Sequence, residues 1–194
     1  MVGEVLDETF FARPVGEVAP QLLGCVIEVG AVAGQIVEVE RYQQDDPASH
    51  SFRGPTPRAA VMFGPAGRLY VYRSYGIHWC ANVVCEPEGH GAAVLIRAVA
   101  PTRGLDLMRE RRGTDVDRNL CSGPGKLCEA FGIDGLMNAT ELGAGPVRLL
   151  RGEPVSDTVC GPRIGISVAV DKPWRFGVAG SPHLSRPFPQ AVAA

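Results

Sequence analysis

The chain has 194 residues, of which 45% are hydrophobic and 21% charged, and its formal net charge is −2. This length and composition are typical of one ordinary globular domain, so we expect a single domain that covers residues 1–194. No apolar run approaches the length of a membrane-spanning helix, which argues against a membrane span or a membrane partner.

The charges are unevenly distributed along the chain. Residues 1–46 hold nine acidic and two basic side chains, a balance of −7, whereas residues 47–194 hold twelve acidic and seventeen basic ones, a balance of +5. This asymmetry permits a basic face for a polyanionic partner but does not require one.

The six cysteines lie far apart without a CxxC pair, and the amino terminus lacks the apolar segment of a signal peptide. Reduced thiols and a cytoplasmic location are therefore expected. His78, Cys80, Cys85 and His90 could be read as metal ligands. Cys80 and Cys85 are five residues apart, however, and would face opposite sides of one strand, so we expect no metal site.

The first predicted element in chain order is a short amphipathic helix over residues 15–23. Two strands follow, over residues 25–29 and 35–42. Residues 43–68 contain four prolines and three glycines, which predicts a long irregular loop. Loops of this length in compact domains are usually functional or disordered.

A hairpin is predicted next, in the stretch LYVYRSYGIHWCANVV at residues 69–84. Its strands are residues 69–73 and 77–84, joined by Ser74-Tyr75-Gly76, with Gly76 supplying the positive φ that a short turn demands. The turn tip offers little core in which to bury the ring of Tyr75. A large aromatic side chain there needs an explanation other than packing.

The remaining elements are a mixture of strands and two helices. Strands are predicted at residues 92–100 and near 147–150 and 163–170. One helix is capped by Thr102 and runs to Arg112, and another begins at Pro124 and ends before Gly132. A proline-rich tail follows Ser181 and is expected to be loose beyond about residue 186. Because strands and helices do not alternate as in βαβ units, the predicted class is α+β.

Alternation along GQIVEVERY places Ile36, Glu38, Glu40 and Tyr42 on one face of a strand, and Val37, Val39 and Arg41 on the other. A carboxylate and a tyrosine ring would then project together, roughly 7 Å apart. The alternative is a solvated strand face. In the hairpin, Tyr70 and Tyr72 share a face, and His78, Cys80 and Asn82 share a face of the returning strand.

Two further stretches carry candidate residues. The loop DDPASHSFRGPTPR offers His50 beside Arg53 and Arg58. Ser122-Gly123-Pro124 opens a helix with Lys126 in its first turn, which is a plausible seat for one phosphate, although a plain capped helix is an equal alternative. One task would explain the candidate residues together: the aromatic side chains on two strands, the carboxylate, the histidine with its arginines and the exposed tip tyrosine. An enzyme that acts on a base in duplex DNA must extrude that base, bind it in a pocket and fill the gap left in the base stack.

The chain also resembles the alkyladenine (methylpurine) DNA glycosylase family, from about Ala12 to Ser185. The segments that carry the resemblance are IVEVERY, ASHS, TPR, MFGPAGRLYVYRSYG, VLIRAVAP, CSGPGKLC and RIGISV with a later GSP, in order and with compatible spacing. The resemblance implies a single mixed domain with an antiparallel sheet, a few short helices and a protruding β-hairpin. It also implies excision of alkylated purines such as 3-methyladenine and of deaminated purines such as hypoxanthine, without a cofactor or metal, leaving an abasic site.

The resemblance assigns roles to individual residues. Glu40 corresponds to the base that activates water and Arg97 to an arginine that helps to hold that water, with the carbonyl near Ile164 as a further water ligand. Tyr42, His50 and Tyr72 correspond to residues that enclose the flipped base, Asn82 to a pocket asparagine, Tyr75 to the intercalating tyrosine, and Thr56, Arg58, Met62 and Lys126 to DNA contacts. The chain departs from the family in a loop between Tyr42 and His50 that is one residue shorter, and in His78 and Trp79 after the wedge.

The expected partner is double-stranded DNA that contains damaged purines, and we expect a monomer. Two alternatives belong to other classes. A noncatalytic damaged-DNA-binding protein on the same scaffold would be expected to lack the carboxylate, and Glu40 is present. A small-molecule enzyme or zinc-bound domain would fail to retard DNA.

Overall fold

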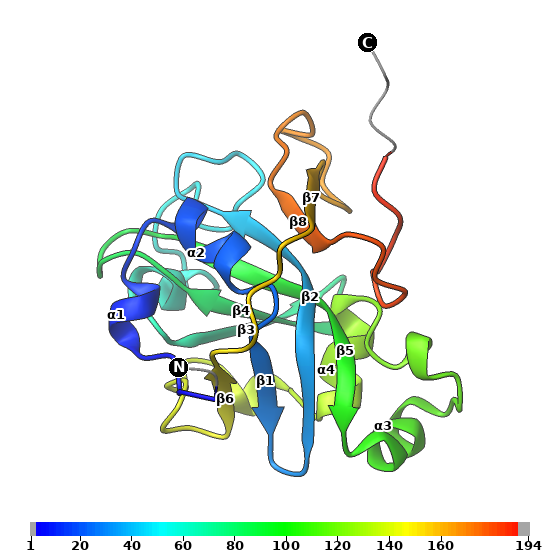
Figure 1. The fold of residues 1–194 in the computed structure, drawn as a ribbon. Helices are drawn as coiled ribbons and strands as arrows, with labels where there is room; N and C mark the ends of the chain where they lie inside the picture. The colour runs from blue at the N-terminus through cyan, green and yellow to red at the C-terminus, as the bar shows by residue number, and fades with distance from the viewer. Residues whose placement is uncertain (1–2, 190–194) are drawn as a thin grey trace.

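The computed structural model describes residues 3–189, and its architecture is α+β, as predicted (Figure 1). An eight-stranded antiparallel sheet forms the centre, in the order β3-β4-β5-β2-β1-β6, with β8 paired to both β2 and β7. The strands are β1 (Val26–Val29), β2 (Val32–Tyr42), β3 (Leu69–Ser74), β4 (His78–Val84), β5 (Ala93–Arg103), β6 (Val147–Leu150), β7 (Thr158–Gly161) and β8 (Arg175–Val178). The helices are α1 (Glu8–Phe11), α2 (Val15–Gln21), α3 (Leu105–Arg112) and α4 (Pro124–Phe131), with short 3-10 turns η1 (Ala60–Phe63), η2 (Asp117–Asn119) and η3 (Gly135–Met137).

The two longest strands, β2 and β5, form the axis of the sheet. One edge of β2 pairs with β5 along its length, while the opposite edge pairs first with β1, through residues 32–35, and then with β8, through residues 38–40. Figure 1 shows β1 beside the lower half of β2 and β8 beside its upper part. The sheet therefore changes neighbours at the segment that carries Glu38 and Glu40.

Two β-bulges of opposite sense lie at this point. Between β2 and β5 the register runs from Ile36 opposite Val99 to Glu38 opposite Ala98, and then to Val39 opposite Ile96. Val37 on β2 and Arg97 on β5 are thus each an extra residue, and the second bulge restores the register that the first one shifts. Bulges are frequent next to active sites because they re-aim side chains.

The bulge at Val37 corrects one predicted face. Ile36 does not share the side of Glu38 and Glu40, since it packs in the main core with Val39. Strict alternation fails here because an extra residue turns the strand by half a period.

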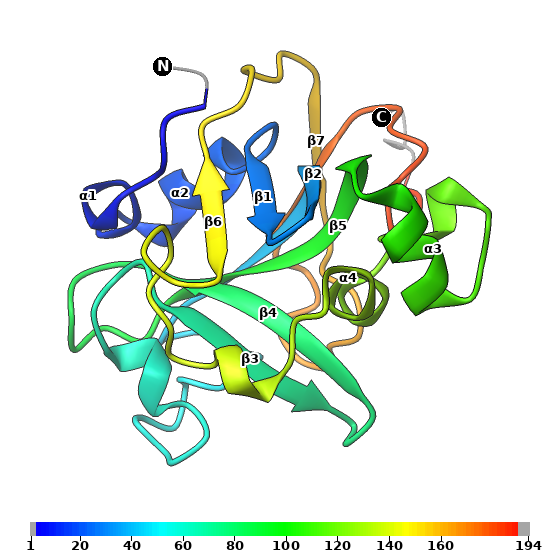
Figure 2. The same cartoon turned by 90° about the horizontal axis from the view of Figure 1, so that it is seen from below.

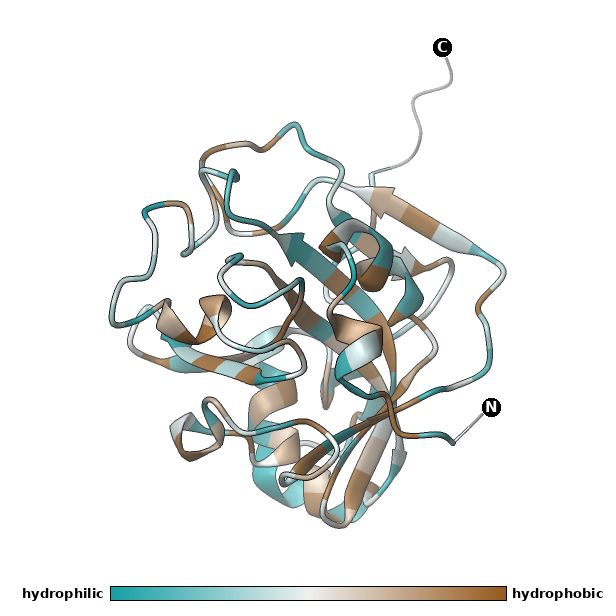
Figure 3. Cartoon of the chain, turned by 90° about the vertical axis from the view of Figure 1, so that its left-hand side faces the viewer, coloured by the Kyte–Doolittle hydropathy of each residue, from teal (hydrophilic) through white to brown (hydrophobic). Residues whose placement is uncertain are grey.

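The main core lies between the sheet and the helices α1, α2 and α4. It contains Phe11, Val18, Ile27, Ile96 and Phe131 among its fully or nearly fully buried members. A second, smaller core holds Ala59, Met62, Tyr70, Val84 and Ala93 beneath the loop that follows β2. In Figure 3 the apolar colours concentrate along strands and helices, and most of the outer loops are hydrophilic or neutral.

The predicted hairpin is present, with its boundaries moved by one residue. Ser74 pairs with His78, so Ser74 belongs to β3 and Ile77 to the turn. Tyr75 and Gly76 have φ values of +51° and +69°, and the Ile77 amide donates to the Ser74 carbonyl over 3.0 Å. Two successive positive φ values are the signature of the turn that matches the twist of a two-stranded ribbon. The turn projects at the lower right of Figure 2.

Several other boundaries agree with the sequence. Helices α2, α3 and α4 and strands β1, β5 and β6 occur where expected, and both α3 and α4 end at a glycine with positive φ. Thr102, however, does not cap a helix: it lies in β5, which extends to Arg103, and Gly104 precedes α3. The loop 43–68 contains η1 and buries Asp46, Ser49 and Ser51, so it is packed.

The predicted strand at residues 163–170 is wrong. The segment is irregular, because Gly165 and Ala169 have φ values of +77° and +51°, outside the extended region. The strands of this part of the chain are instead β7 and β8, which the sequence analysis missed.

The loose part of the tail, predicted beyond about residue 186, also needs correction up to Phe188. The Arg175 guanidinium donates to the carbonyl oxygens of Arg186 and Pro187 and lies 3.8 Å over the Phe188 ring. The prediction for residues 190–194 lies outside the described residues.

Candidate active site

A cavity of about 630 Å³ opens between the β3–β4 hairpin, the loop that follows β2, and the irregular segment before β8. Most of the predicted site residues line it. They are Tyr42, His50, Arg58, Met62, Tyr72, Tyr75, Asn82 and Arg97. Side chains that are scattered through residues 42–97 of the sequence therefore surround one hollow.

Glu40 lies behind the wall of this cavity and is completely buried. Its Oε2 accepts a hydrogen bond from the Tyr42 hydroxyl over 2.8 Å and faces Nη1 of Arg97 at 3.4 Å. Its Oε1 accepts from the backbone amide of Ile164 over 2.7 Å. The three residues that contact the carboxylate all line the cavity. The alternative of a solvated strand face is thereby excluded for Glu40.

The contact between Ile164 and Glu40 was not predicted. It is the amide nitrogen of Ile164, not its carbonyl, that approaches Glu40. A water contact of the carbonyl stays a prediction.

Arg97 is bound to two carboxylates at once. Its Nε lies 3.2 Å from Oε1 of Glu38, in addition to its contact with Glu40. Burial alone lowers the pKa of Arg97, but the neighbouring charges of Glu40 and Glu38 outweigh this effect and raise it. The guanidinium therefore stays charged and compensates for the buried carboxylates.

Aromatic rings form one side of the cavity. The ring centroids of Tyr70 and Tyr72 are 5.4 Å apart, and His50 meets Tyr72 edge-on at 4.6 Å. Burial is the main cause that raises the pKa of Tyr42 and of Tyr72, so both phenols are neutral at pH 7. The pairing of Tyr70 with Asn82 and of Tyr72 with Cys80 places both strands' candidate residues on one face of the hairpin.

His50 is an uncharged member of this wall. Burial first, and the nearby Arg58 second, lower its pKa to about 4. Its Nδ1 lies 2.9 Å from the hydroxyl of Tyr70, a residue that the sequence analysis did not assign to the site. Tyr70 could have been found from its position two residues before Tyr72 on the same strand face.

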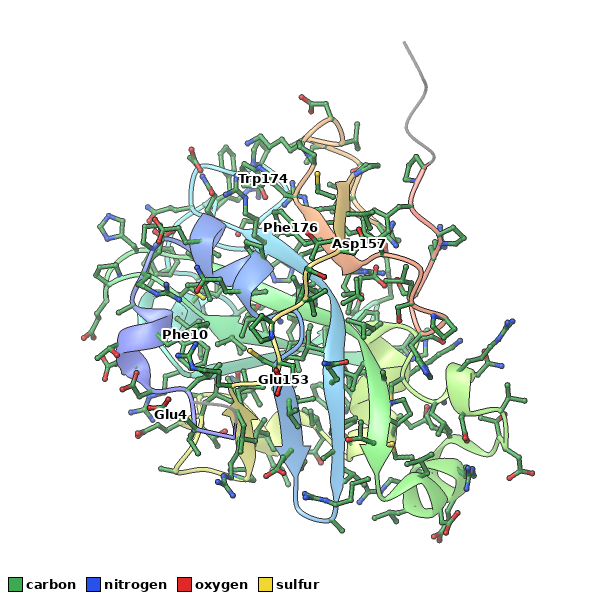
Figure 4. All side chains as sticks on the ribbon, in the orientation of Figure 1. Glu4, Phe10, Glu153, Asp157, Trp174 and Phe176 are labelled. Carbon is green, nitrogen blue, oxygen red and sulfur yellow. The ribbon has the colours of Figure 1, made fainter. Side chains whose placement is uncertain are left out.

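Tyr42 is supported by a second missed residue, Arg163. The Arg163 guanidinium lies 4.6 Å over the Tyr42 ring and forms a completely buried ion pair with Asp46. The ring of Trp174, which lies just before β8 and is labelled at the top of Figure 4, is within 5.1 Å of the same guanidinium. The ion pair joins residues 117 positions apart, so no local sequence signal could have revealed it.

The hairpin tip is the most exposed part of the site. Tyr75 is 87% exposed and Ile77 is 68% exposed. Arg58 lies behind them, with its guanidinium 5.0 Å over the Tyr72 ring and Nη2 donating to the Arg73 carbonyl. A large aromatic ring thus projects from the rim of the cavity into solvent.

Asn82 is held by a local bond. Its Nδ2 donates to the Tyr70 carbonyl over 3.0 Å, and the side chain is 4% exposed.

Two predicted DNA contacts, Thr56 and Lys126, do not line the cavity. Thr56 accepts from the Ala59 amide, and Lys126 is exposed on the first turn of α4, whose first residue, Pro124, reaches the cavity.

Two features are absent from the described part of the chain. Within residues 3–189, no three His, Cys, Asp or Glu side chains gather in a way that could hold a metal ion. Across the same residues, none of the helices is both long enough and apolar enough to cross a membrane.

Comparison with known proteins places the chain in a family. The profile described as "Methylpurine-DNA glycosylase (MPG)" matches residues 9–182. A protein of Rhodopseudomonas palustris named "Putative 3-methyladenine DNA glycosylase" is 58% identical over 189 residues, which cover 97% of this chain and 92% of the relative. Proteins with the same name from Nitrosospira multiformis, 58% identical, and Agrobacterium fabrum, 55% identical, are each covered to 93% of their length. The chain belongs to the methylpurine-DNA glycosylase family, as the sequence analysis expected.

Proposed function

We propose that the protein is a DNA glycosylase of base-excision repair that flips alkylated or deaminated purines out of duplex DNA and hydrolyses the N-glycosidic bond. The observation that carries the proposal is a buried carboxylate, Glu40, placed directly behind a cavity with aromatic walls. The names of the relatives, which concern 3-methyladenine in DNA, support the same class of substrate.

Glu40 serves as the general base. Oε2 is already engaged by Tyr42 and Arg97, whereas Oε1 accepts only the Ile164 amide among residues 3–189, and a carboxylate oxygen offers about two acceptor sites. A water bound at the remaining site of Oε1 can give its proton to Glu40 as its oxygen attacks C1′ of the sugar. The bond from C1′ to the purine breaks, and the base leaves with the electron pair.

The transition state of this reaction resembles an oxocarbenium ion. The negative charge of Glu40 favours that cation, because it is preorganised in a site removed from water. Alkylation at N3 or N7 makes the purine cationic and a better leaving group. The chemistry therefore needs little acid assistance, which is consistent with the neutral states of His50 and the tyrosines.

The aromatic wall binds the flipped base. Tyr42 and Tyr72 offer their ring faces, and a cationic purine stacks favourably on an electron-rich ring. Arg163 already covers part of the Tyr42 ring, so the cavity side of that ring is left for the base. Tyr75, on the exposed tip, enters the stack where the nucleotide has left it.

The proposal is tested with duplex oligonucleotides that each carry one lesion: 7-methylguanine, hypoxanthine or an etheno adduct of adenine. After incubation, alkaline treatment cleaves the strand at abasic sites. We expect cleavage above that of a protein-free control, and only after the alkaline step, which marks a monofunctional enzyme. The control is required because alkali alone also cleaves at 7-methylguanine. Retention of lesion-containing duplex without any cleavage would favour the noncatalytic binding protein, and failure to retard DNA at all would favour the small-molecule class.

A further inference from the structure

We infer that Glu38 is a positioning residue, which together with the carboxy-terminal segment Ser185–Phe188 sets the orientation of Arg97 toward Glu40. This inference deepens the proposed function, on which its activity measurements rest. Neither this carboxylate nor this chain segment takes part in the proposed reaction itself.

Glu38 is completely buried and receives donors from three parts of the chain. Its Oε1 accepts from Nε of Arg97 over 3.2 Å, from Nε of Arg175 over 2.7 Å and from the hydroxyl of Ser185 over 2.7 Å. Its Oε2 accepts from the backbone amide of Ser185 over 2.5 Å. Glu38 thus receives four donors, three on Oε1 and one on Oε2, as many as a carboxylate has acceptor sites in total, although it does not line the cavity.

Arg97 has a separate partner for each nitrogen. Nε is bound to Glu38, Nη1 faces Glu40 at 3.4 Å, and Nη2 is 3.4 Å from the hydroxyl of Ser185. The contact with Glu38 is the shortest of the three. An arginine left alone with one carboxylate forms a bidentate pair in preference to a single long contact. Glu38 and Ser185 therefore keep Arg97 from closing onto Glu40 and occupying the acceptor sites that water needs.

The carboxy-terminal segment is fixed for this task. Arg175 compensates for the charge of Glu38 and donates to the carbonyl oxygens of Arg186 and Pro187, while the Phe188 ring lies against the guanidinium. A Cβ on Gly177 of β8 would come within 2.6 Å of the Phe188 ring, so this close approach requires a glycine. The segment thus packs against Glu38 although its first residue, Ser185, is 147 residues away from Glu38 in the sequence.

The first test is the single-turnover excision rate of Glu38→Gln, which keeps the shape of the side chain and removes its charge. We expect a fall on the order of 10- to 100-fold, because small displacements of a catalytic group have effects of this size, with unchanged retention of lesion-containing duplex. Glu28→Gln is the matched control: Glu28 is also a strand carboxylate with two arginine partners, Arg103 and Arg148, but lies away from the cavity. A rate in Glu38→Gln equal to that of Glu28→Gln would overturn the inference.

A positioning role also predicts non-additivity. Because Glu38 acts through Arg97, Glu38→Gln should cause little further loss when it is combined with Arg97→Met. A residue that merely supports the fold would instead multiply the two losses. A multiplicative loss in the double variant would therefore contradict the role assigned to Glu38.

Ser185→Ala provides a variant that keeps every charge, in case Glu38→Gln fails to fold. It removes the hydroxyl that contacts both Glu38 and Arg97, and we expect excision to slow about 3- to 10-fold. Ser181→Ala is its control, since Ser181 lies outside Ser185–Phe188 and its hydroxyl accepts a local hydrogen bond from the His183 amide. Equal rates for the two serine variants would overturn the role of the segment.

An NMR measurement separates this inference from the proposed function. The Arg97 Nε–H resonance, assigned by its loss in Arg97→Lys, should exchange slowly with water in the wild type and roughly tenfold faster in Glu38→Gln, because the acceptor loses its charge. Unchanged exchange would overturn the inference whatever the activity. An inactive wild-type protein with the expected exchange difference would overturn the proposed function alone.

Discussion

The Tyr42 hydroxyl donates a 2.8 Å hydrogen bond to Oε2 of Glu40, two residues earlier on the same strand. One side chain thus lines the cavity with its ring and orients the buried carboxylate with its hydroxyl. In the proposed mechanism, Tyr42 links base binding to water activation, and the Ile164 amide fixes the other carboxylate oxygen.

The first prediction concerns Glu40→Gln. We expect excision to be abolished while lesion binding is retained, because the amide keeps the shape of the side chain but cannot accept the proton of water. The measurement is single-turnover release of the base, together with duplex retention and a thermal unfolding curve. A variant that kept most of its activity would remove Glu40 from the mechanism.

The second prediction concerns Tyr75→Ala at the hairpin tip. Extrusion of a base costs a few kcal/mol of stacking and pairing, and the wedge offsets part of this cost only in a duplex. Excision from duplex DNA should therefore suffer more than excision from any single-stranded substrate that is accepted. Equal losses on both substrates would contradict the wedge. The melting temperature should hardly change, since the ring is 87% exposed.

The third prediction concerns Asn82→Ser. Stacking on Tyr42 and Tyr72 accepts any purine, because every base has a π-face, so selectivity must arise at the edges of the base. The bond from Asn82 to the Tyr70 carbonyl fixes the amide at the cavity wall. At that position we expect its bulk to exclude the 2-amino group of guanine. We expect the variant to remove unmodified guanine detectably faster, while hypoxanthine excision persists.

The measurement for Asn82→Ser is single-turnover release from matched duplexes, with hypoxanthine or guanine opposite the same base. An unchanged ratio of the two rates would show that Asn82 acts only as a local hydrogen-bond donor to the backbone. The sequence alone already allowed this purely local role of Asn82, and the observed hydrogen bond to the Tyr70 carbonyl gives it a physical basis.

The fourth prediction concerns His50 and pH. Its pKa in the folded protein is about 4, below the ordinary value of about 6.5, because burial and Arg58 disfavour the charged ring. The unfolded chain binds more protons between these two pH values, so His50 lowers the free energy of unfolding as the pH falls from about 6.5 toward 4. His50→Asn lacks this titration.

The measurement for His50 is denaturant unfolding at pH 7 and pH 5. The wild type should lose more stability than His50→Asn between the two pH values, and the difference isolates His50 because all other groups are shared. Parallel losses would mean that His50 is protonated in the folded state.

Much of the local structure followed from the sequence alone. The hairpin was predictable because Gly76 and the alternating aromatic residues are short-range signals, and α3 and α4 ended where Gly113 and Gly132 permit a positive φ. The carboxylate and the aromatic residues of the site could also be proposed from one strand and one hairpin, since i and i+2 positions share a face.

Only the tertiary structure decided how those residues are held. The bulges at Val37 and Arg97 depend on the pairing of two strands, and neither leaves a mark in the local pattern. The pair of Asp46 with Arg163 and the contact of Glu38 with Ser185 join positions 117 and 147 residues apart. Local preferences determine elements because they act between near neighbours, whereas burial of a charge requires partners that only the folded chain brings together.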